Sequence, residues 1–321
     1  MLLKKTKILS CGAYLPKKIL TNDDLSQIVD TSDQWIFDRT GIRQRHIADK
    51  NEYTSDLGYK AAIQAIENAK IDVQEIELII VATTTPDNIF PSTATKIQHK
   101  LQISQGFAFD IQAVCSGFVY AISVAEKYIK TGTVKKALVI GAETLSRILD
   151  WQDRNTCVLF GDGAGAVILS AESEGDSDII DSQLHSDGNL YEILNTSGGP
   201  SLTGGAGVIT MKGREVFKHA VYRMSETIKS IITKNNLSVA DIKLVIPHQA
   251  NQRILSAVAH KAGLNEKQVI STVEIHANTS AASIPLALYK ALSNNRINRG
   301  DYIILEALGA GLTWGSILVK W

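Results

Sequence analysis

The 321-residue sequence predicts a layered α/β fold made of two similar halves. Short apolar runs, typical of buried strands, alternate with longer stretches in which apolar residues recur every three or four positions. Residues 71–82 and 237–248 have the same apolar spacing, and a helical pattern precedes each of them. Alternating strands and helices of this kind form sheets that are covered by helices.

Two further pairs of segments repeat in the same order. Residues 136–142 match residues 301–307, and residues 161–170 match the glycine-containing residues 309–319. Three ordered correspondences predict an internal duplication, with an N-terminal half over residues 1–171 and a C-terminal half over residues 172–321. A chain of this length is expected to exceed one compact core in any case.

Local patterns predict the individual elements. Strands are expected over residues 7–13 and, as a buried strand, over 107–111; helices are expected over 54–70, 118–130 and 215–235. Residues 21–24, Thr-Asn-Asp-Asp, offer a helix cap before Leu25, Ile28 and Val29. Residues 31–46 are rich in charge and turn formers, and the glycine-rich residues 198–207 predict a surface loop.

The composition excludes several classes of function. The 33 basic residues balance the 33 acidic ones, so there is no global preference for nucleic acid or for an anionic membrane. No apolar run approaches the length of a membrane span, and the N-terminal residues lack the apolar segment of a leader. Three cysteines without metal-ligand spacing favour a reducing compartment. A cytoplasmic protein is therefore expected.

Cys115 lies where the predicted strand 107–111 gives way to a helix, among the small residues Ala113, Ser116 and Gly117. Unpaired amides and the helix dipole at such a junction favour an anion, so we expect a stabilised thiolate there. The alternative is inert packing, since cysteine is among the most buried residue types. The cysteine alone leaves both interpretations open.

Two polar residues of the second half can join this cysteine. His248 comes just past the end of a buried strand predicted from residues 244–247, and Asn278 lies in a turn before a helix. Taken alone, His248 is more simply interpreted as a histidine whose hydrogen bonds are satisfied within the fold, and Asn278 as a turn former. If the halves are duplicated, equivalent strand ends meet near the pseudo-twofold axis, where Cys115, His248 and Asn278 would supply a nucleophile and two polarising donors.

Seven motifs identify a family resemblance. They are AVCSGF at 113–118, PHQAN at 247–251, HANTSAAS at 276–283, GAGLTWGS at 309–316, TSDQWI at 31–36, RTGIR at 39–43 and FGDGAGA at 160–166. In this order and over essentially the whole chain, they resemble β-ketoacyl-[acyl carrier protein] synthase III. The resemblance implies a thiolase-type fold with five layers, α-β-α-β-α, made of two duplicated halves and usually assembled as a homodimer.

The resemblance also implies a reaction. An acyl group, expected to be acetyl, moves from acyl-CoA to Cys115; malonyl-acyl carrier protein then loses carbon dioxide and attacks it. The product is a 3-oxoacyl-acyl carrier protein, which initiates type II fatty acid synthesis. No cofactor is implied, because acyl-CoA is a substrate.

Further roles follow from the same resemblance. His248 and Asn278 would donate hydrogen bonds to the malonyl thioester oxygen, and the backbone amides of Cys115 and Ala310 would form an oxyanion hole. Many relatives have glycine where this chain has Ala310, and a positive φ at that position would be strained for alanine.

The remaining positions that match the family are expected to bind the substrates; alone, each would be interpreted as an ordinary surface or core side chain. For CoA these are Thr31, Trp35, Arg39, Arg154, Gly213, Phe217, Ala250 and Asn251. The acyl pocket would be formed by Leu145, Phe160, Leu308 and, across a dimer, Phe90; many relatives have phenylalanine in place of Leu308. Lys218, Arg253 and Lys261 match a docking patch for the acidic carrier protein.

Three alternatives remain. A specialised condensing enzyme or acyltransferase of the same fold would use a different acceptor. A nucleotide-binding protein or dehydrogenase is suggested by the glycines at 161–165, but the spacing of a dinucleotide fingerprint is missing. A scaffold without catalysis would not need the three polar residues. The sequence leaves the length of the primer acyl chain open.

Overall fold

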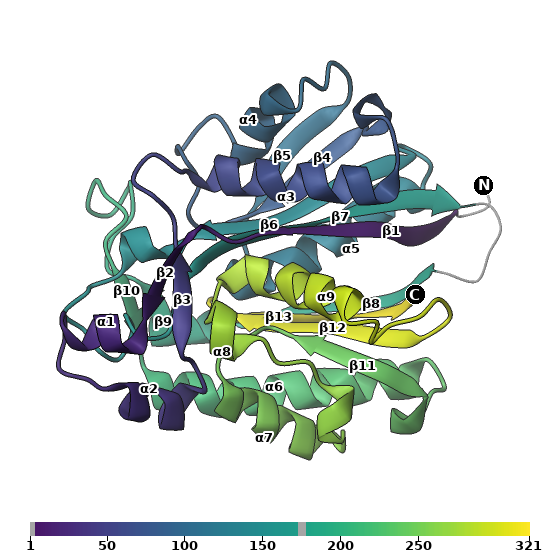
Figure 1. Cartoon of the computed structure of the whole chain (residues 1–321). Helices are drawn as coiled ribbons and strands as arrows, with labels where there is room; N and C mark the ends of the chain where they lie inside the picture. Colours follow the sequence, from purple (N-terminus) through teal and green to yellow (C-terminus); the bar gives the residue numbers. More distant parts are fainter. Residues whose placement is uncertain (1–3, 173–177) are drawn as a thin grey trace.

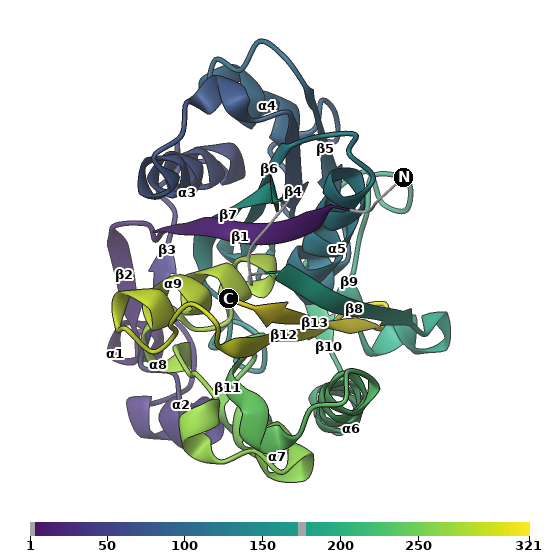
Figure 2. The same ribbon diagram turned by 90° about the vertical axis from the view of Figure 1, so that its right-hand side faces the viewer.

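The computed structural model describes residues 4–172 and 178–321, and its elements form five layers (Figures 1 and 2). Helices α3 (Thr54–Ala69) and α4 (Thr93–Lys100) cover one sheet, and α6 (Gly213–Lys234) and α7 (Gln252–Ala262) lie on the far side of the other. Helices α5 (Gly117–Lys130) and α9 (Ser283–Ser293) fill the layer between the sheets. The predicted α-β-α-β-α architecture is confirmed.

The first sheet has the strand order β1-β7-β6-β4-β5. Its strands are β1 (Lys5–Tyr14), β4 (Leu78–Ala82), β5 (Phe107–Ile111), β6 (Lys136–Thr144) and β7 (Asp162–Glu172). Strand β4 is parallel to β5 and β6, while β7 is antiparallel to β6 and β1. The interior strand β4 is an apolar run buried on both faces, as parallel strands covered by helices require.

The second sheet repeats this arrangement in the order β11-β12-β13-β8. Its strands are β8 (Asp178–Ser186), β11 (Ile242–Pro247), β12 (Tyr302–Gly309) and β13 (Thr313–Lys320). Strand β11 is parallel to β12, and β13 is antiparallel to β12 and β8. The three repeated sequence pairs fall on β4 and β11, β6 and β12, and β7 and β13. This agreement supports an internal duplication, and the division at residues 171/172 stays a prediction.

The main hydrophobic core lies around the two central helices. Apolar side chains of α5 and α9 pack between inward-facing residues of both sheets, with Phe118 and Ile284 fully buried. Where the first sheet meets the turn before α9, the backbones approach very closely: a Cβ on Gly141 would lie 2.2 Å from the Ala281 carbonyl oxygen. Only glycine fits there. The two halves therefore meet tightly beside the beginning of α9.

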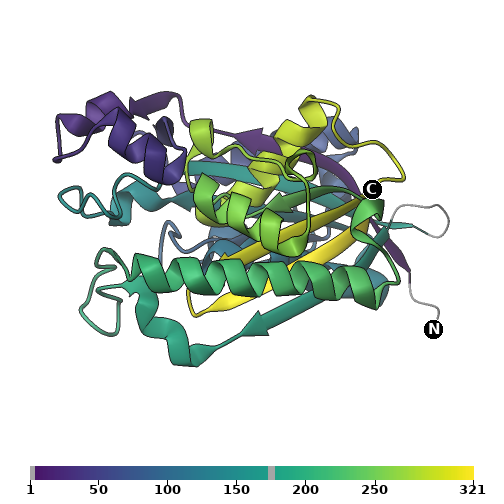
Figure 3. The same cartoon turned by 90° about the horizontal axis from the view of Figure 1, so that it is seen from below.

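Smaller elements surround one end of the molecule. The N-terminal arm contains β2 (Lys18–Thr21), α1 (Asn22–Ser26), α2 (Asp33–Thr40) and β3 (Gln44–Ile47), and β9 (Leu194–Thr196) pairs with β10 (Ile209–Met211) (Figures 1 and 3). The glycine-rich residues 198–207 form the exposed loop between β9 and β10, as expected. Helix α8 (Val273–His276) precedes the turn that contains Asn278.

Several predicted details need correction. Thr21 caps α1 with a capping box, but the helix ends at Ser26, before the 43% exposed Ile28. Residues 31–46, which are rich in charge and turn formers, contain α2 and most of β3. The 107–111 strand exists but is not buried: β5 is a sheet edge, and Phe107 is 38% exposed.

None of the helices in the described ranges is long and apolar enough to cross a membrane. The prediction that the N-terminal segment is not a leader falls partly on residues 1–3, which lie outside the described residues.

Candidate active site

One cavity of about 1720 Å³ is lined by residues of both halves. Cys115, His248, Asn278 and Ala310 all line it, although they come from four separate segments of the chain. The topology explains this meeting, because Cys115 precedes α5 and Asn278 precedes α9, and these helices begin next to each other. A Cβ on Gly117 would lie 3.6 Å from the Cβ of Ala281.

Cys115 sits in the short 3₁₀ turn Val114–Ser116 between β5 and α5, and it is buried. Its neighbour Val114 has φ 49°, a left-handed conformation that is costly for a β-branched residue and typical of functional turns. Burial raises the pKa of the Cys115 thiol to about 12; the Ser280 hydroxyl and the cysteine amide lower it, and the nearby Glu143 raises it. Burial therefore opposes the stabilised thiolate that the strand-to-helix junction led us to expect.

A buried carboxyl group lies behind the cysteine. Glu143, at the end of β6, accepts hydrogen bonds from the Thr83, Thr84 and Thr85 hydroxyls at 2.6–3.2 Å and from the Thr84 amide. Burial raises the pKa of Glu143, while these threonines and the Ser280 hydroxyl lower it. Ser280 Oγ is buried without a hydrogen-bond partner at ordinary distance, and it lowers the pKa of both Cys115 and Glu143.

His248 directly follows β11 and is 3% exposed. Burial lowers the pKa of its imidazole to about 3, so the ring is neutral at physiological pH. Its Nδ1 lies 2.7 Å from Ser283 Oγ, and that oxygen already accepts a hydrogen bond from the Gln249 amide. Donation of the Ser283 proton to Nδ1 satisfies both groups, and we infer from this that the ring hydrogen resides on Nε2. This tautomer gives His248 one free donor.

Asn278 is fixed by its backbone and its side chain. Its amide donates to the Leu159 carbonyl at 2.9 Å, and its carbonyl accepts from the Gly161 amide at 3.0 Å. The side-chain Oδ1 accepts a hydrogen bond from the Ser280 amide at 2.9 Å. Because the oxygen end is occupied within the turn, the Nδ2 group is the end that can donate to a ligand.

The turn between β12 and β13 presses against the cysteine backbone. A Cβ on Gly309 would lie 2.8 Å from the Cys115 amide nitrogen and 2.9 Å from the Ala113 carbonyl oxygen. Ala310 does not have the positive φ that would strain it; the left-handed residue of this turn is Gly311, with φ +130°. The alanine is therefore compatible with the turn geometry.

The residues expected at the CoA site gather mostly at the mouth of the cavity. The guanidinium carbons of Arg39 and Arg154 lie 4.4 and 5.2 Å from the Trp35 ring. Gly213, Phe217, Ala250 and Asn251 also line the cavity, whereas Thr31 does not. Asn251 additionally caps α7 by accepting from the Ile254 amide. An aromatic ring flanked by two cations suits a planar, anionic ligand.

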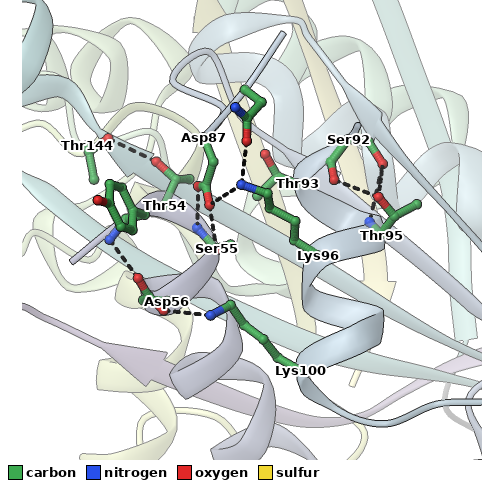
Figure 4. A network of polar contacts seen from close by, with 12 residues as sticks. Thr54, Ser55, Asp56, Asp87, Ser92, Thr93, Thr95, Lys96, Lys100 and Thr144 are labelled. Atoms are coloured by element: carbon green, nitrogen blue, oxygen red, sulfur yellow. Dashed lines mark hydrogen bonds and ion pairs between the residues drawn. The ribbon is translucent and has the colours of Figure 1, made fainter. Parts of the chain in front are cut away.

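The expected acyl-pocket residues divide into two groups. Leu145, Phe160 and Leu308 are buried and line the cavity, whereas Phe90 is 83% exposed at its rim. The loop that carries Phe90 is anchored at its base: Asp87 accepts from the amide and hydroxyl of Ser55 at 2.9 and 2.7 Å and pairs with Lys96 of α4 (Figure 4). The exposed ring therefore stands on a fixed support.

Lys218, Arg253 and Lys261 are exposed on the face formed by α6 and α7. Arg253 and Lys261 line a shallow groove between the two helices, while Lys218 lies outside it. Lys261 stands 4.5 Å from the Tyr222 ring, and Arg253 stands 5.9 Å from Phe217. Since Arg253 and Phe217 also line the large cavity, this basic face adjoins its mouth.

Sequence reasoning missed the residues that support the site. Ser283 and Ser280 lie within a quoted motif, but nothing in the motif distinguishes one serine from another. Glu143 and the three threonines before Pro86 are far apart in sequence, and only their meeting in the fold reveals them. An acidic residue within an otherwise apolar strand was the available signal for Glu143.

Comparison with known proteins agrees with this geometry. Residues 109–188 match the family described as 3-Oxoacyl-[acyl-carrier-protein (ACP)] synthase III, and residues 232–321 match its C-terminal region. The chain belongs to the β-ketoacyl-[acyl-carrier-protein] synthase III family. It is 55% identical to the synthase III of Rhodospirillum centenum over 99% of both chains. It is 57% identical to that of Wolbachia pipientis wMel, over 99% of this chain and all of the relative.

A solved structure gives the same result. The 3-oxoacyl-[acyl-carrier-protein] synthase III of Aquifex aeolicus superposes with a TM-score of 0.94 at 47% identity, over 98% of this chain and 100% of that one. Membership confirms the predicted thiolase-type fold and the predicted class of enzyme, a condensing acyltransferase of fatty acid synthesis. The roles of individual residues remain predictions.

Proposed function

We propose that this chain transfers an acyl group from acyl-CoA to Cys115 and condenses it with malonyl-acyl carrier protein. The observation that carries the proposal is the convergence of three groups in one cavity: a buried thiol, a neutral histidine with a free Nε2 donor, and an asparagine whose oxygen is occupied. Their residue types match a covalent acyl transfer followed by formation of an enolate.

In the first step, the Cys115 sulfur attacks the thioester carbonyl carbon of acyl-CoA. The amides of Cys115 and Ala310 stabilise the tetrahedral oxyanion, CoA leaves, and the cysteine proton goes to the departing CoA sulfur. Because burial raises the thiol pKa to about 12, ionisation is coupled to attack and does not precede substrate binding. Before acyl-CoA binds, Cys115 therefore remains a protonated thiol, which is a poor nucleophile.

In the second step, malonyl-acyl carrier protein loses carbon dioxide, and the remaining electron pair forms an enolate. His248 Nε2 and Asn278 Nδ2 donate to its oxygen. A positively charged histidine could transfer its proton to the enolate oxygen and would then lose its role as a donor. The neutral ring of His248 donates the hydrogen bond and keeps its proton, so it does not become anionic. The enolate carbon attacks the acyl group, and Cys115 leaves as a thiolate that takes up one proton. The protein needs no added cofactor for these steps, because decarboxylation generates the nucleophile.

The substrates would enter from the α6–α7 face. The adenine of CoA would stack on Trp35 beside Arg39 and Arg154, and its pantetheine would pass Gly213, Phe217, Ala250 and Asn251. The exposed Lys218, Arg253 and Lys261 suit an acidic carrier protein. Thr31 does not line the cavity, so we assign it no direct contact with CoA.

We also propose a homodimer. Strand β5 is paired only with β4, so its other edge is open among the described residues. Phe107 on this strand is partly exposed, and Ile89 and Phe90 on the anchored loop are 75% and 83% exposed. Pairing two β5 edges would cover these apolar groups, and Phe90 could then bound the partner's acyl pocket.

A cytoplasmic location is supported by three free cysteines.

Intact-protein mass spectrometry tests the first step. After incubation with acetyl-CoA, the natural chain should gain one acetyl group and Cys115→Ser should gain none. Adding malonyl-acyl carrier protein should discharge the acetyl group into acetoacetyl-acyl carrier protein. Acylation without discharge would favour a specialised acyltransferase of the same fold. No acylation by acetyl-CoA or by longer acyl-CoAs would refute the covalent mechanism.

A further inference from the structure

The turn that carries Ala310 is held from two sides. On the inner side, Ser116 Oγ donates to the Thr313 carbonyl at 2.9 Å, and Thr313 Oγ1 donates to the Ala113 carbonyl at 2.9 Å. These bonds join the turn to the nucleophile segment itself. They set its distance from Cys115, but they leave its outer side to be fixed by another part of the chain.

Asp187 provides that outer support. Its amide donates to the Leu312 carbonyl at 2.8 Å, and its carbonyl accepts from the Leu312 amide at 3.0 Å. Asp187 directly follows β8 and caps the 3₁₀ helix Gly188–Ile193 by accepting from the Asn189 amide. These two backbone hydrogen bonds fix the position of the Ala310 turn relative to Asp187.

Arg223 of α6 contacts both neighbours of the turn. Its Nη2 donates to Asp187 Oδ2 at 3.3 Å, and its guanidinium carbon lies 4.4 Å from the ring of the buried Trp314. Its Nε is buried without a partner, so the position of this side chain depends on the carboxylate and the ring together.

We propose that Arg223 is a positioning residue for the oxyanion hole, acting through Asp187 and Trp314 on the Ala310 turn. The inference rests on the proposed function, since the Ala310 amide matters only if Cys115 is acylated. The Arg223–Asp187 pair is partly exposed, with side-chain exposures of 29% and 26%, so it contributes little to overall stability. Its effect is on the placement of one amide.

The same contact connects substrate binding with the turn. Helix α6 begins at Gly213, carries Phe217 at the cavity mouth and presents the exposed Lys218. Arg223 lies on this helix, next to Tyr222, which contacts Lys261 of α7. Arg223 therefore joins the helix that carries Phe217 to Asp187 and Trp314, without involving His248 or Asn278.

The experiment compares two half-reactions in Arg223→Met, which keeps an unbranched side chain, although a shorter one, and removes the planar charge. Self-acylation by acetyl-CoA uses the Ala310 amide, whereas decarboxylation of malonyl-acyl carrier protein uses His248 and Asn278. We expect the acylation rate to fall about tenfold, part of what loss of one oxyanion donor costs, with decarboxylation unchanged within about twofold. Arg223→Lys should restore part of the rate, because it retains the charge but not the flat fork.

Lys229→Met is the matched control, because Lys229 lies on the same helix in an exposed ion pair with Glu226 and should leave both rates unchanged. Equal losses of both half-reactions in Arg223→Met, or wild-type acylation, would overturn the positioning role. If the natural chain performs neither half-reaction, the proposed function fails. If it performs both and Arg223→Met does too, only this inference fails.

Discussion

The hydrogen bond between Ser283 and His248 predicts a selective defect in decarboxylation. In Ser283→Ala, Nδ1 loses the donor that fixes the ring tautomer, and the Gln249 amide loses its acceptor. One neutral hydrogen bond is worth roughly 1 kcal/mol, and a buried group left unpaired costs about 1–3 kcal/mol. If about 1–2 kcal/mol of this reaches the tautomer preference, the decarboxylation rate falls by roughly 5- to 30-fold. Complete loss of an oxyanion donor, about 10²- to 10³-fold, is the upper limit.

The assay measures release of carbon dioxide from malonyl-acyl carrier protein at saturating substrate, alongside acetylation of Cys115 by acetyl-CoA. Acetylation should change little, because Ser283 contacts neither the cysteine nor the Ala310 turn. Ser293→Ala is the control, since this exposed hydroxyl at the end of the same helix bonds only the Tyr289 carbonyl. Wild-type decarboxylation in Ser283→Ala, or an equal loss of both half-reactions, would refute the assigned tautomer.

Three further predictions concern packing, pH and substrate binding. Gly309→Ala places a Cβ within 2.9 Å of backbone atoms around Cys115, so we expect lost acylation and a lower Tm, whereas Gly188→Ala, with open space around it, should change neither. Burial lowers the pKa of His276 to about 4, below its unfolded value near 6.5; its stabilising contribution is therefore complete above that value and lost as pH falls through it. When the pH is lowered from 7.5 to 5.5, the free energy of unfolding in urea should decrease in both proteins, and the decrease should be about 1.4 kcal/mol smaller in His276→Gln than in the natural chain. Trp35→Ala should raise the KM for acetyl-CoA about tenfold and leave that for an acyl-pantetheine unchanged, since only the former has an adenine to stack.

The sequence predicted the fold where apolar periodicity reflects burial. The repeated spacing located β4 and β11, and the strand-to-helix junction located Cys115. The same approach placed Phe107 in a buried strand, because an apolar run has the same appearance at the edge and at the centre of a sheet. Whether a strand has a neighbour on one side depends on pairing between distant segments, which local periodicity does not contain.

The residue partners were harder to predict. The local argument for a stabilised thiolate considered the helix that follows Cys115, whereas its pKa is dominated by burial under the second half of the chain. Ser283 lies 35 positions from His248, and Arg223 lies 36 positions from Asp187. No spacing rule connects such pairs, so motif resemblance identified the candidate reacting groups and the structure showed the residues that contact them.

The bond between Ser116 and Thr313 spans 197 positions of the chain. During synthesis on the ribosome, the nucleophile segment emerges long before the strands that close over it. A nascent chain that ends before β12 has the cysteine but neither the histidine's neighbouring strand nor the amide of Ala310. Acyl-CoA therefore meets no competent site until nearly the whole protein has been made, and incomplete chains cannot trap the activated acyl group.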